Sequence, residues 1–352
     1  LAVTVSELCA LVCLLVRKKV CKRIIDTSAG DTSTDRVAVI AKRLIKSCIP
    51  VSAAAIVVNL SSFIDLITIP RCLNFALSSD PGYFAACFSD IIKAQGGAVR
   101  LANFMYGSYT GLSWTMFMLI PSFTAMFGRS ALPQIAGAWT LGNRNEFERK
   151  VTVVLRSNFV IGFPLYLGLS AMSRQILEFL FSGRQQEVSV SATSLFILGL
   201  GGVFLTLSST FISIFQVIGR SDLPVKLMLP GCAVKLIFNV FTISVPAINI
   251  NGAAVSTVIM YAAVALGGYF ALENVTGIDF HIIRRMAVPL SAGVVCAVVS
   301  RIVYGFVGES VNAVAALFLP IASGGAVYII LLIIFNEINL KSLLNRQKRK
   351  KF

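Results

Sequence analysis

The sequence predicts an all-α protein that crosses a membrane several times. Of its 352 residues, 56% are hydrophobic and only 13% are charged, and the mean hydropathy is +0.82. A soluble domain carries about 25% charged residues, and a soluble fold of this length could not hide so much apolar surface in one core. A bilayer can hold such a chain as helices, because a helix satisfies its own backbone hydrogen bonds inside lipid.

Nine apolar runs have the length of a membrane-spanning helix, which is about 20 residues. They are residues 1–16, 45–69, 103–127, 151–171, 192–217, 224–244, 251–271, 286–306 and 312–335. The chain begins with Leu1 directly inside the first run, without the basic segment or cleavage site of a signal peptide. We therefore expect the natural protein to extend further toward the N-terminus.

The basic residues predict which side of the membrane each loop occupies. The net charge is +15, and Lys and Arg gather between the apolar runs and at the C-terminus. By the positive-inside rule, loops rich in these residues stay in the cytoplasm. The rule places residues 17–44, 128–150 and 336–352 inside, and residues 70–102 and 245–250 outside. The C-terminus is therefore predicted to be cytoplasmic. No basic stripe is interleaved with aromatic residues, so nucleic acid is not an expected partner.

Residues 31–46 differ from the apolar runs. Val37, Ile40 and Leu44 share one face of a helix, whereas the basic side chains mostly occupy the other faces. That pattern is typical of an amphipathic helix lying in the inner headgroup layer of a membrane. The alternative is a cytoplasmic extension of the second span.

Charged residues inside apolar runs are costly and usually face a cavity or a partner. Asp65 lies in the outer half of the second run, six residues before Arg71. It is a candidate cation site, proton site or gate acid, or else it pairs with Arg71 at the rim. Lys235 lies nine residues past Lys226, about 13 Å into its run, and Asn239 follows one turn later on the same face. Lys235 is a candidate contact for a phosphate or an acid, or else an interhelical polar clamp.

Four further residues are weaker candidates. Arg156 lies near the cytoplasmic end of its run, where a guanidinium can reach water by snorkelling, and a role at a cavity mouth is the alternative. Tyr106, Tyr109 and Gln216 are neutral polar groups, for which interhelical hydrogen bonding is the default interpretation. Tyr and Gln side chains that line a cavity would instead suit sugar recognition.

The chain lacks the motifs of the common enzyme and pump classes. It contains no GxxxxGK[ST] loop, no HExxH and no GxSxG, and His281 is its single histidine. Its eight cysteines form no CxxC, which argues against a zinc site. We expect neither an enzyme nor a bound metal or cofactor. Cys72 and Cys87 fall in a loop predicted to be outside, so a disulfide between them is an open alternative.

Four stretches occur in order along the chain: NLSSFIDLITIPRCL, YGSYTGLSWTMFMLIPSFTAMFGRSALPQIAGAWTLGN, LGLGGVFLTLSSTFISIFQVIGRSDLPVKLMLPGCAVKLIFN and INGAAVSTVIMY. They resemble the seventh helix, the eighth helix, the tenth and eleventh helices and the start of the twelfth helix of the multidrug/oligosaccharidyl-lipid/polysaccharide exporter superfamily. The closest resemblance is to the stage V sporulation protein B group of polysaccharide biosynthesis proteins, which are relatives of MurJ-type flippases.

This resemblance implies a MATE/MurJ-like fold of fourteen helices, with two six-helix lobes and two additional helices. The nine runs then correspond to helices six to fourteen. Residues 1–16 would be the last helix of a truncated N-terminal lobe, 17–44 a cytoplasmic linker with the amphipathic helix, 45–272 the six-helix C-terminal lobe, 286–335 the two additional helices and 336–352 a basic cytoplasmic tail.

The resemblance also implies a function and partners. Members of the family flip polyprenyl-diphosphate-linked oligosaccharides, which are cell-wall or polysaccharide precursors, across the bacterial cytoplasmic membrane by alternating access. The implied partners are that lipid-linked substrate, membrane lipids, and a coupling cation or proton. Lys235 is the phosphate candidate, because a basic cavity offsets the desolvation of a diphosphate.

One departure from the family concerns the substrate. MurJ-type relatives carry charged residues on the eighth helix, facing the cavity. This chain has Tyr106, Ser108, Tyr109 and Thr110 at the corresponding place. Specificity for a peptidoglycan precursor is therefore not implied by the resemblance. A drug/cation antiporter of the same superfamily and a non-transporting membrane scaffold for envelope or spore assembly are the alternatives.

A second departure concerns the coupling ion. Some relatives bind sodium with an acid on helix seven, polar residues on helix eleven and a threonine on helix twelve. Asp65, Asn239 and Thr257 match that set, but Lys235 stands where a neutral ligand is expected. We hypothesise that the ammonium of Lys235 replaces the ion and pairs with Asp65.

Overall fold

The computed structural model describes Leu8 and residues 11–13, 37–95, 97, 100–129, 131–307 and 311–335 of the chain. It divides into two compact units, residues 1–49 and residues 50–352. Every regular element within the described residues is a helix, and these residues contain no β-strand. The predicted all-α class is thereby confirmed.

Seven helices in the described part of the chain are long and apolar enough to cross a membrane. They are the Asn59–Ser79 part of α2 (Val37–Ser79), α8 (Arg144–Ala171), α10 (Gln185–Val217), α11 (Asp222–Ile243), α12 (Asn251–Thr276), α13 (Ile282–Val307) and α14 (Ala313–Ile334). Each overlaps one of the predicted runs. A helix of 26 residues, such as α12, is about 39 Å long and exceeds a hydrocarbon core of about 30 Å. The protein is a multi-pass membrane protein.

Two of the nine predicted runs are not among these seven helices. The run at residues 1–16 lies almost wholly outside the described residues. The run at residues 103–127 is helical, but it consists of three consecutive pieces. These are α5 (Leu101–Ser108), the π-helical segment η2 (Tyr109–Trp114) and α6 (Thr115–Arg129), and none of them alone has the length of a span.

Two reciprocal hydrogen bonds of serine hydroxyls join α10 to η2 and to the last residue of α5. The Ser113 hydroxyl donates to the Ser191 carbonyl at 2.8 Å, and the Ser191 hydroxyl donates to the Ser108 carbonyl at 2.9 Å. All three serines are buried. A π-helical turn leaves backbone groups less regularly paired than an α-helix does, and such turns are frequent at functional sites. Ser191 of α10 supplies both a donor and an acceptor at this irregular turn.

The helix α2 is longer than the second predicted run at both ends. Residues 37–46 belong to the helix α2, while residues 31–36 lie outside the described residues. Beyond α2, the short helices α3 (Pro81–Cys87) and α4 (Ser89–Gln95) occupy much of the predicted loop at 70–102. Asp80 caps α3 by accepting the Tyr83 backbone N–H at 3.0 Å. Cys72 and Cys87 are both free thiols.

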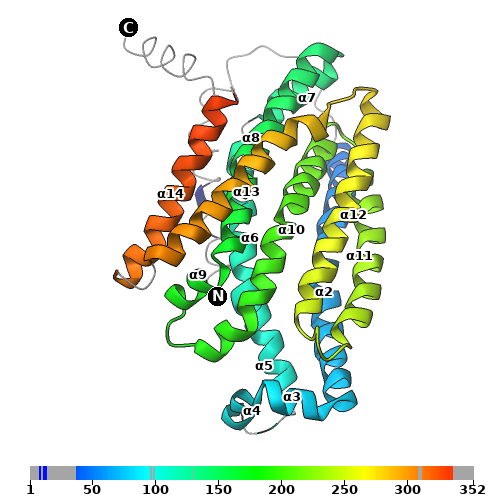
Figure 1. The fold of residues 1–352 in the computed structure, drawn as a ribbon. Helices are drawn as coiled ribbons and strands as arrows, with labels where there is room; N and C mark the ends of the chain where they lie inside the picture. Colours follow the sequence, from blue (N-terminus) through cyan, green and yellow to red (C-terminus); the bar gives the residue numbers. More distant parts are fainter. Residues whose placement is uncertain are drawn as a thin grey trace. The chain divides into compact units, whose positions relative to one another are not determined.

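The helix α10 is the central element of residues 50–352, since it packs against both α8 and α12 and is buried over most of its length (Figure 1). Close packing depends on glycines without side chains. A Cβ atom on Gly202 would lie 2.1 Å from the Tyr166 ring of α8, and one on Gly201 would lie 2.2 Å from Val258 of α12. Small residues let helix backbones approach closely inside a membrane, where helices associate by packing and interhelical hydrogen bonds.

The helices α13 and α14 form a pair that packs on α8. The Tyr328 hydroxyl of α14 donates to the Val160 carbonyl of α8 at 2.7 Å. A Cβ atom on Gly324 would lie 2.1 Å from the Ser300 hydroxyl oxygen, so α14 also lies against α13 at close range. Two shorter helices, α7 (Leu132–Thr140) and α9 (Ser173–Leu180), lie at opposite ends of α8 (Figure 1).

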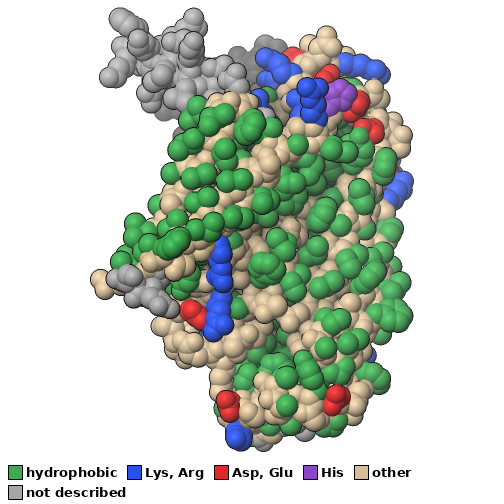
Figure 2. All heavy atoms as spheres, in the orientation of Figure 1, with side chains coloured by type: hydrophobic (Ala, Val, Ile, Leu, Met, Phe, Trp, Pro, Cys, Tyr) green, Lys and Arg blue, Asp and Glu red, His purple; other side chains and the backbone are tan. Residues whose placement is uncertain are grey.

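The outer surface of the long helices is apolar, as a lipid-facing surface requires. Figure 2 shows hydrophobic side chains over the middle of this face, with most of the Lys, Arg, Asp and Glu side chains near its two ends. Large exposed hydrophobic side chains on these helices include Phe238, Phe241, Leu266, Phe270, Val298, Ile302, Phe306, Phe318, Ile329 and Ile330. Such a surface would aggregate in water, whereas lipid tails solvate it.

Replacing Gly202 with Ala tests the close contact between α10 and α8. The new methyl group would overlap the buried Tyr166 ring, and overpacking typically costs about 1–3 kcal/mol, more than the roughly 1 kcal/mol that Ala gains over Gly in a helix. We expect Gly202→Ala to lower the melting temperature of the detergent-solubilised protein by several degrees. The control is Gly168→Ala on α8, where a Cβ atom meets nothing within 4 Å and the melting temperature should stay or rise. Equal changes in melting temperature for the two variants would contradict the close contact of Gly202 with Tyr166.

Candidate functional site: a buried polar cluster on three helices

A fully buried ion pair lies between α2 and α11. The Lys235 ammonium is 2.6 Å from the Asp65 carboxylate oxygen Oδ2 and also donates to the Ser61 hydroxyl at 2.9 Å. Lys235 is 0% exposed and Asp65 is 4% exposed. A lone charge at this depth would carry a large desolvation cost, which the opposite charge and the hydrogen bonds offset. The pair makes the centre of the cluster electrically neutral.

Asn239 completes the coordination of the Asp65 carboxylate. Its amide nitrogen donates to Asp65 Oδ1 at 3.0 Å and to the Thr68 hydroxyl at 2.9 Å, and its amide oxygen accepts from the Ser256 hydroxyl of α12. Both oxygens of Asp65 therefore have a nitrogen donor. Through Asn239, the cluster joins α2, α11 and α12 in one hydrogen-bond network.

Helical spacing explains why these side chains meet. Lys235 and Asn239 are four residues apart and face the same side of α11. Ser61, Asp65 and Thr68 are spaced by four and three residues and form a matching stripe on α2. All five side chains are buried. The stripe on α2 covers about two helical turns and the stripe on α11 about one, and every member finds a partner on the opposite helix.

Aromatic side chains of η2 and α12 border the cluster. The ring centroid of Trp114, the last residue of η2, lies 5.6 Å from the Lys235 nitrogen, within the range of a cation–π contact. Tyr109 of η2 and Tyr261 of α12 are both buried and belong to the same hydrophobic cluster. The π-helical segment thus contributes the aromatic wall beside the ammonium.

The hypothesised pair of Lys235 with Asp65 is present, and Asn239 lies in the same cluster. Arg71, the alternative partner of Asp65, is exposed and belongs to no part of this network. Thr257 is buried but donates to the Ala253 carbonyl of its own helix at 2.8 Å, and its neighbour Ser256 makes the contact to Asn239 instead.

The remaining candidates divide between the border of the cluster and other places. Tyr106 is half-buried on α5 and lies within electrostatic reach of Asp65. Arg156 is half-buried on α8, twelve residues after the helix begins at Arg144. Gln216 is exposed and lines a separate polar cavity of about 410 Å³. The polar side chains of that cavity are Ser122, Thr124, Asn158, Ser209, Thr210, Ser213 and Gln216.

Four members of the cluster were not singled out from the sequence: Ser61, Thr68, Ser256 and Trp114. A signal for two of them was present, because Ser61 and Thr68 flank Asp65 at the spacing of one helical turn. Ser256 and Trp114 carried no such signal. Within the part of the chain that the structure describes, no three His, Cys, Asp or Glu side chains gather in a group that could hold a metal ion.

Comparisons with known proteins place the chain in a family. Residues 98–323, which is more than half of the chain, match the family described as the lipid II flippase MurJ. The chain belongs to the MurJ family. This family is one of transporters rather than enzymes.

Two curated relatives extend the MurJ comparison. The lipid II flippase MurJ of Bacillus subtilis (strain 168) is 22% identical over 243 residues, which cover 67% of this chain and 44% of that protein. An uncharacterized membrane protein of Methanocaldococcus jannaschii is 27% identical over 153 residues, which cover 44% of this chain and 29% of that protein. The chain thus spans less than half the length of these two relatives.

A double-mutant cycle tests whether the buried pair acts as a unit. Lys235→Met leaves the Asp65 carboxylate buried without its countercharge, a situation that typically costs about 3–5 kcal/mol. The double variant Asp65→Asn with Lys235→Met removes both charges, so it should be less destabilised than the sum of the two single variants. Thermal unfolding in detergent measures each variant.

The matched control for this cycle is the exposed pair of Lys226 with Asp222 at 2.9 Å, where Lys226→Met should cost about 0–1 kcal/mol. Additive effects of Asp65→Asn and Lys235→Met would show that the two charges are energetically independent, against the geometry described above.

Proposed function

We propose that the chain is the C-terminal part of a transporter that flips a polyprenyl-diphosphate-linked oligosaccharide across the bacterial cytoplasmic membrane. The observation that carries this proposal is the match of residues 98–323 to the MurJ family, one member of which is named a lipid II flippase. Neither the diphosphate nor the glycan of such a lipid crosses hydrocarbon unaided, because both would lose their hydration. A protein path through the membrane removes that cost.

The buried pair supports a proposal about the coupling ion. The Lys235 ammonium already occupies the position beside Asp65, and Asn239 donates to the other oxygen of the same carboxylate. A separate cation at Asp65 would have to displace Lys235 and would then meet its charge at close range. We therefore infer that Lys235 serves as a built-in cation, and that this protein does not need sodium at this place.

The same pair limits direct contact between Lys235 and substrate. In this structure Lys235 is 0% exposed and already donates to Asp65 and to Ser61. A diphosphate could reach its ammonium only in another state in which α2 and α11 separate. The role that the geometry supports for Lys235 is to hold α2 and α11 together, with phosphate contact confined to an open state.

Alternating access is the transport mechanism that we propose. In transporters built from two lobes, the lobes rock about a central site. The described helices carry prolines within their length at Pro121, Pro164, Pro230, Pro289 and Pro320. Each proline removes a backbone hydrogen bond and favours a bend. We further propose a cytoplasmic C-terminus, since Lys and Arg gather in the loops and in the tail that the positive-inside rule assigns to the cytoplasm.

Flipping by the complete natural protein in proteoliposomes tests this function. The substrate is a fluorescent polyprenyl-diphosphate oligosaccharide, and loss of its fluorescence to an external quencher reports the flipped fraction. We expect wild-type protein and the exposed-site control Lys226→Ala to flip it, and Lys235→Ala to lower the rate at least tenfold. Ser61→Ala, which keeps the ion pair but removes one acceptor, should have a smaller effect. Absence of wild-type flipping would refute the flippase.

The ion proposal has its own test in the same vesicles. Replacing sodium by potassium on both sides should leave the wild-type flipping rate unchanged. A sodium-dependent rate or melting temperature that Asp65→Asn abolishes would show that Asp65 binds the ion after all.

A further inference from the structure

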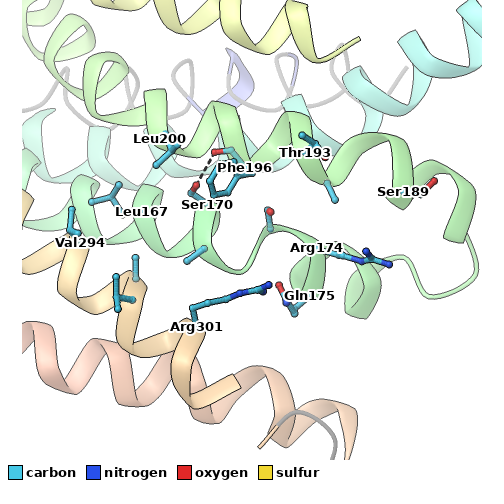
Figure 3. Close-up of a pocket in the computed structure, with 15 residues that line it drawn as sticks. Leu167, Ser170, Arg174, Gln175, Ser189, Thr193, Phe196, Leu200, Val294 and Arg301 are labelled. Carbon is cyan, nitrogen blue, oxygen red and sulfur yellow. Dashed lines mark hydrogen bonds between the residues drawn. The ribbon is translucent and has the colours of Figure 1, made fainter. Parts of the chain in front are cut away.

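A second site candidate lies away from the buried cluster. It is a pocket of about 600 Å³ bounded by the end of α8, by α9, by the first part of α10 and by α13 (Figure 3). None of its lining residues belongs to α2, α11 or α12, which carry the Lys235 cluster. Cavities of roughly 300–1,000 Å³ are the usual size for small-molecule ligands.

One wall of the pocket is apolar and faces outward from the helices. Phe196 and Leu200 come from α10, and Val294 and Val298 come from α13. Their exposed fractions are 44%, 48%, 47% and 51%, so these large side chains are only half covered by the protein. A hydrocarbon chain laid between α10 and α13 would cover them.

The other end of the pocket is cationic. Arg301 extends from α13 toward Gln175 of α9, and Arg174 lies next to Gln175 on α9 (Figure 3). Arg174 pairs with Glu178 at 2.8 Å, and this carboxylate raises the pKa of the Arg174 guanidinium. Among the described residues, Arg301 has no carboxylate within ion-pair distance. The two guanidiniums and one carboxylate therefore leave an excess positive charge.

Arg301 is unusual in its position. It lies within α13, six residues before the helix ends at Val307, or about 9 Å along its axis. A charge inside a membrane-spanning helix is costly and normally has a partner or a function. The Gln175 side-chain oxygen beside it is buried and has no hydrogen-bond partner. The polar end of the pocket thus has a side-chain oxygen without a hydrogen bond and a guanidinium without a carboxylate partner among the described residues.

We propose that this pocket binds an anionic phospholipid of the surrounding bilayer. The phosphate would contact Arg301 and Arg174, and Gln175 could rotate its amide to donate to the same group. An acyl chain would lie along Phe196, Leu200 and Val298. A soluble anion would leave the half-exposed apolar wall uncovered. A lipid without net charge would leave the excess positive charge without a partner.

The position in the bundle fits this ligand. The pocket lies where α8 ends and α10 begins, and α9 connects these two helices (Figure 1). A lipid held there touches α9 and α10 on one side and α13 on the other. It would therefore stabilise the packing of α13 against the bundle, and a ligand that binds only the folded state raises its melting temperature.

Binding of phosphatidylglycerol to the delipidated complete protein, followed by native mass spectrometry and thermal shift, tests the proposal. We expect phosphatidylglycerol to bind and raise the melting temperature, and phosphatidylcholine to bind at least tenfold more weakly. Arg301→Gln should weaken phosphatidylglycerol at least tenfold, with Arg301→Lys intermediate. The control is Arg184→Gln, an exposed arginine of the same connection that does not line the pocket, and it should bind like wild type.

Three outcomes would overturn the proposal. Arg301→Gln and Arg301→Lys could both bind phosphatidylglycerol like wild type, or phosphatidylcholine could bind as tightly as phosphatidylglycerol. Alternatively, soluble glycerol phosphate could compete at the same concentration as the lipid, which would make the pocket a site for free phosphate groups. Because none of these readouts measures flipping, they are independent of the proposed transport function.

Discussion

The buried ion pair of Lys235 with Asp65 constrains how α2 and α11 can move relative to each other. Both charges lie where water is excluded, so neither can leave the other without a desolvation cost of several kcal/mol. Asn239 extends the same network to α12. Helices that carry such a network move together, or else they separate far enough to admit water to both charges at once. A transporter needs states of this kind, because discrete arrangements, rather than gradual deformation, keep the two sides of a membrane from opening together.

The sequence predicted the centre of this network but not its periphery. Asp65 and Lys235 stand out because a charge inside an apolar run has few explanations, and the family resemblance suggested that they meet. Hydroxyl groups give no comparable signal, since Ser and Thr on a helix can bond to their own backbone, as Thr257 does. Residues 256 and 257 differ by about 100° around the helix, and the sequence does not fix the rotation of α12 about its axis. The sequence pattern therefore favoured Thr257 for the contact that Ser256 makes with Asn239.

Hydropathy predicted the long helices well and their ends poorly. A span is recognisable because about 20 consecutive residues must be apolar enough to lie in lipid. The end of α2 at Ser79 is instead a local feature, where two short helices follow. Arg301 lies inside an apolar run, and hydropathy does not single it out, because one charge barely alters the average over a window of about 20 residues. Arg301 becomes a candidate binding residue only because it lines the same pocket as Arg174 and Gln175, which lie on a helix far away in the sequence.

The π-helical segment has a consequence for the shape of its whole helical run. One extra residue in a turn changes the phase of every later residue by about 100°, so α5 and α6 present different rows of side chains to their surroundings. Both halves, together with the segment between them, still pack on α10. A single insertion thereby lets one helix offer two distinct faces to the same neighbour. Trp114, whose ring lies beside the Lys235 ammonium, directly follows Ser113, whose hydroxyl donates to the Ser191 carbonyl of α10.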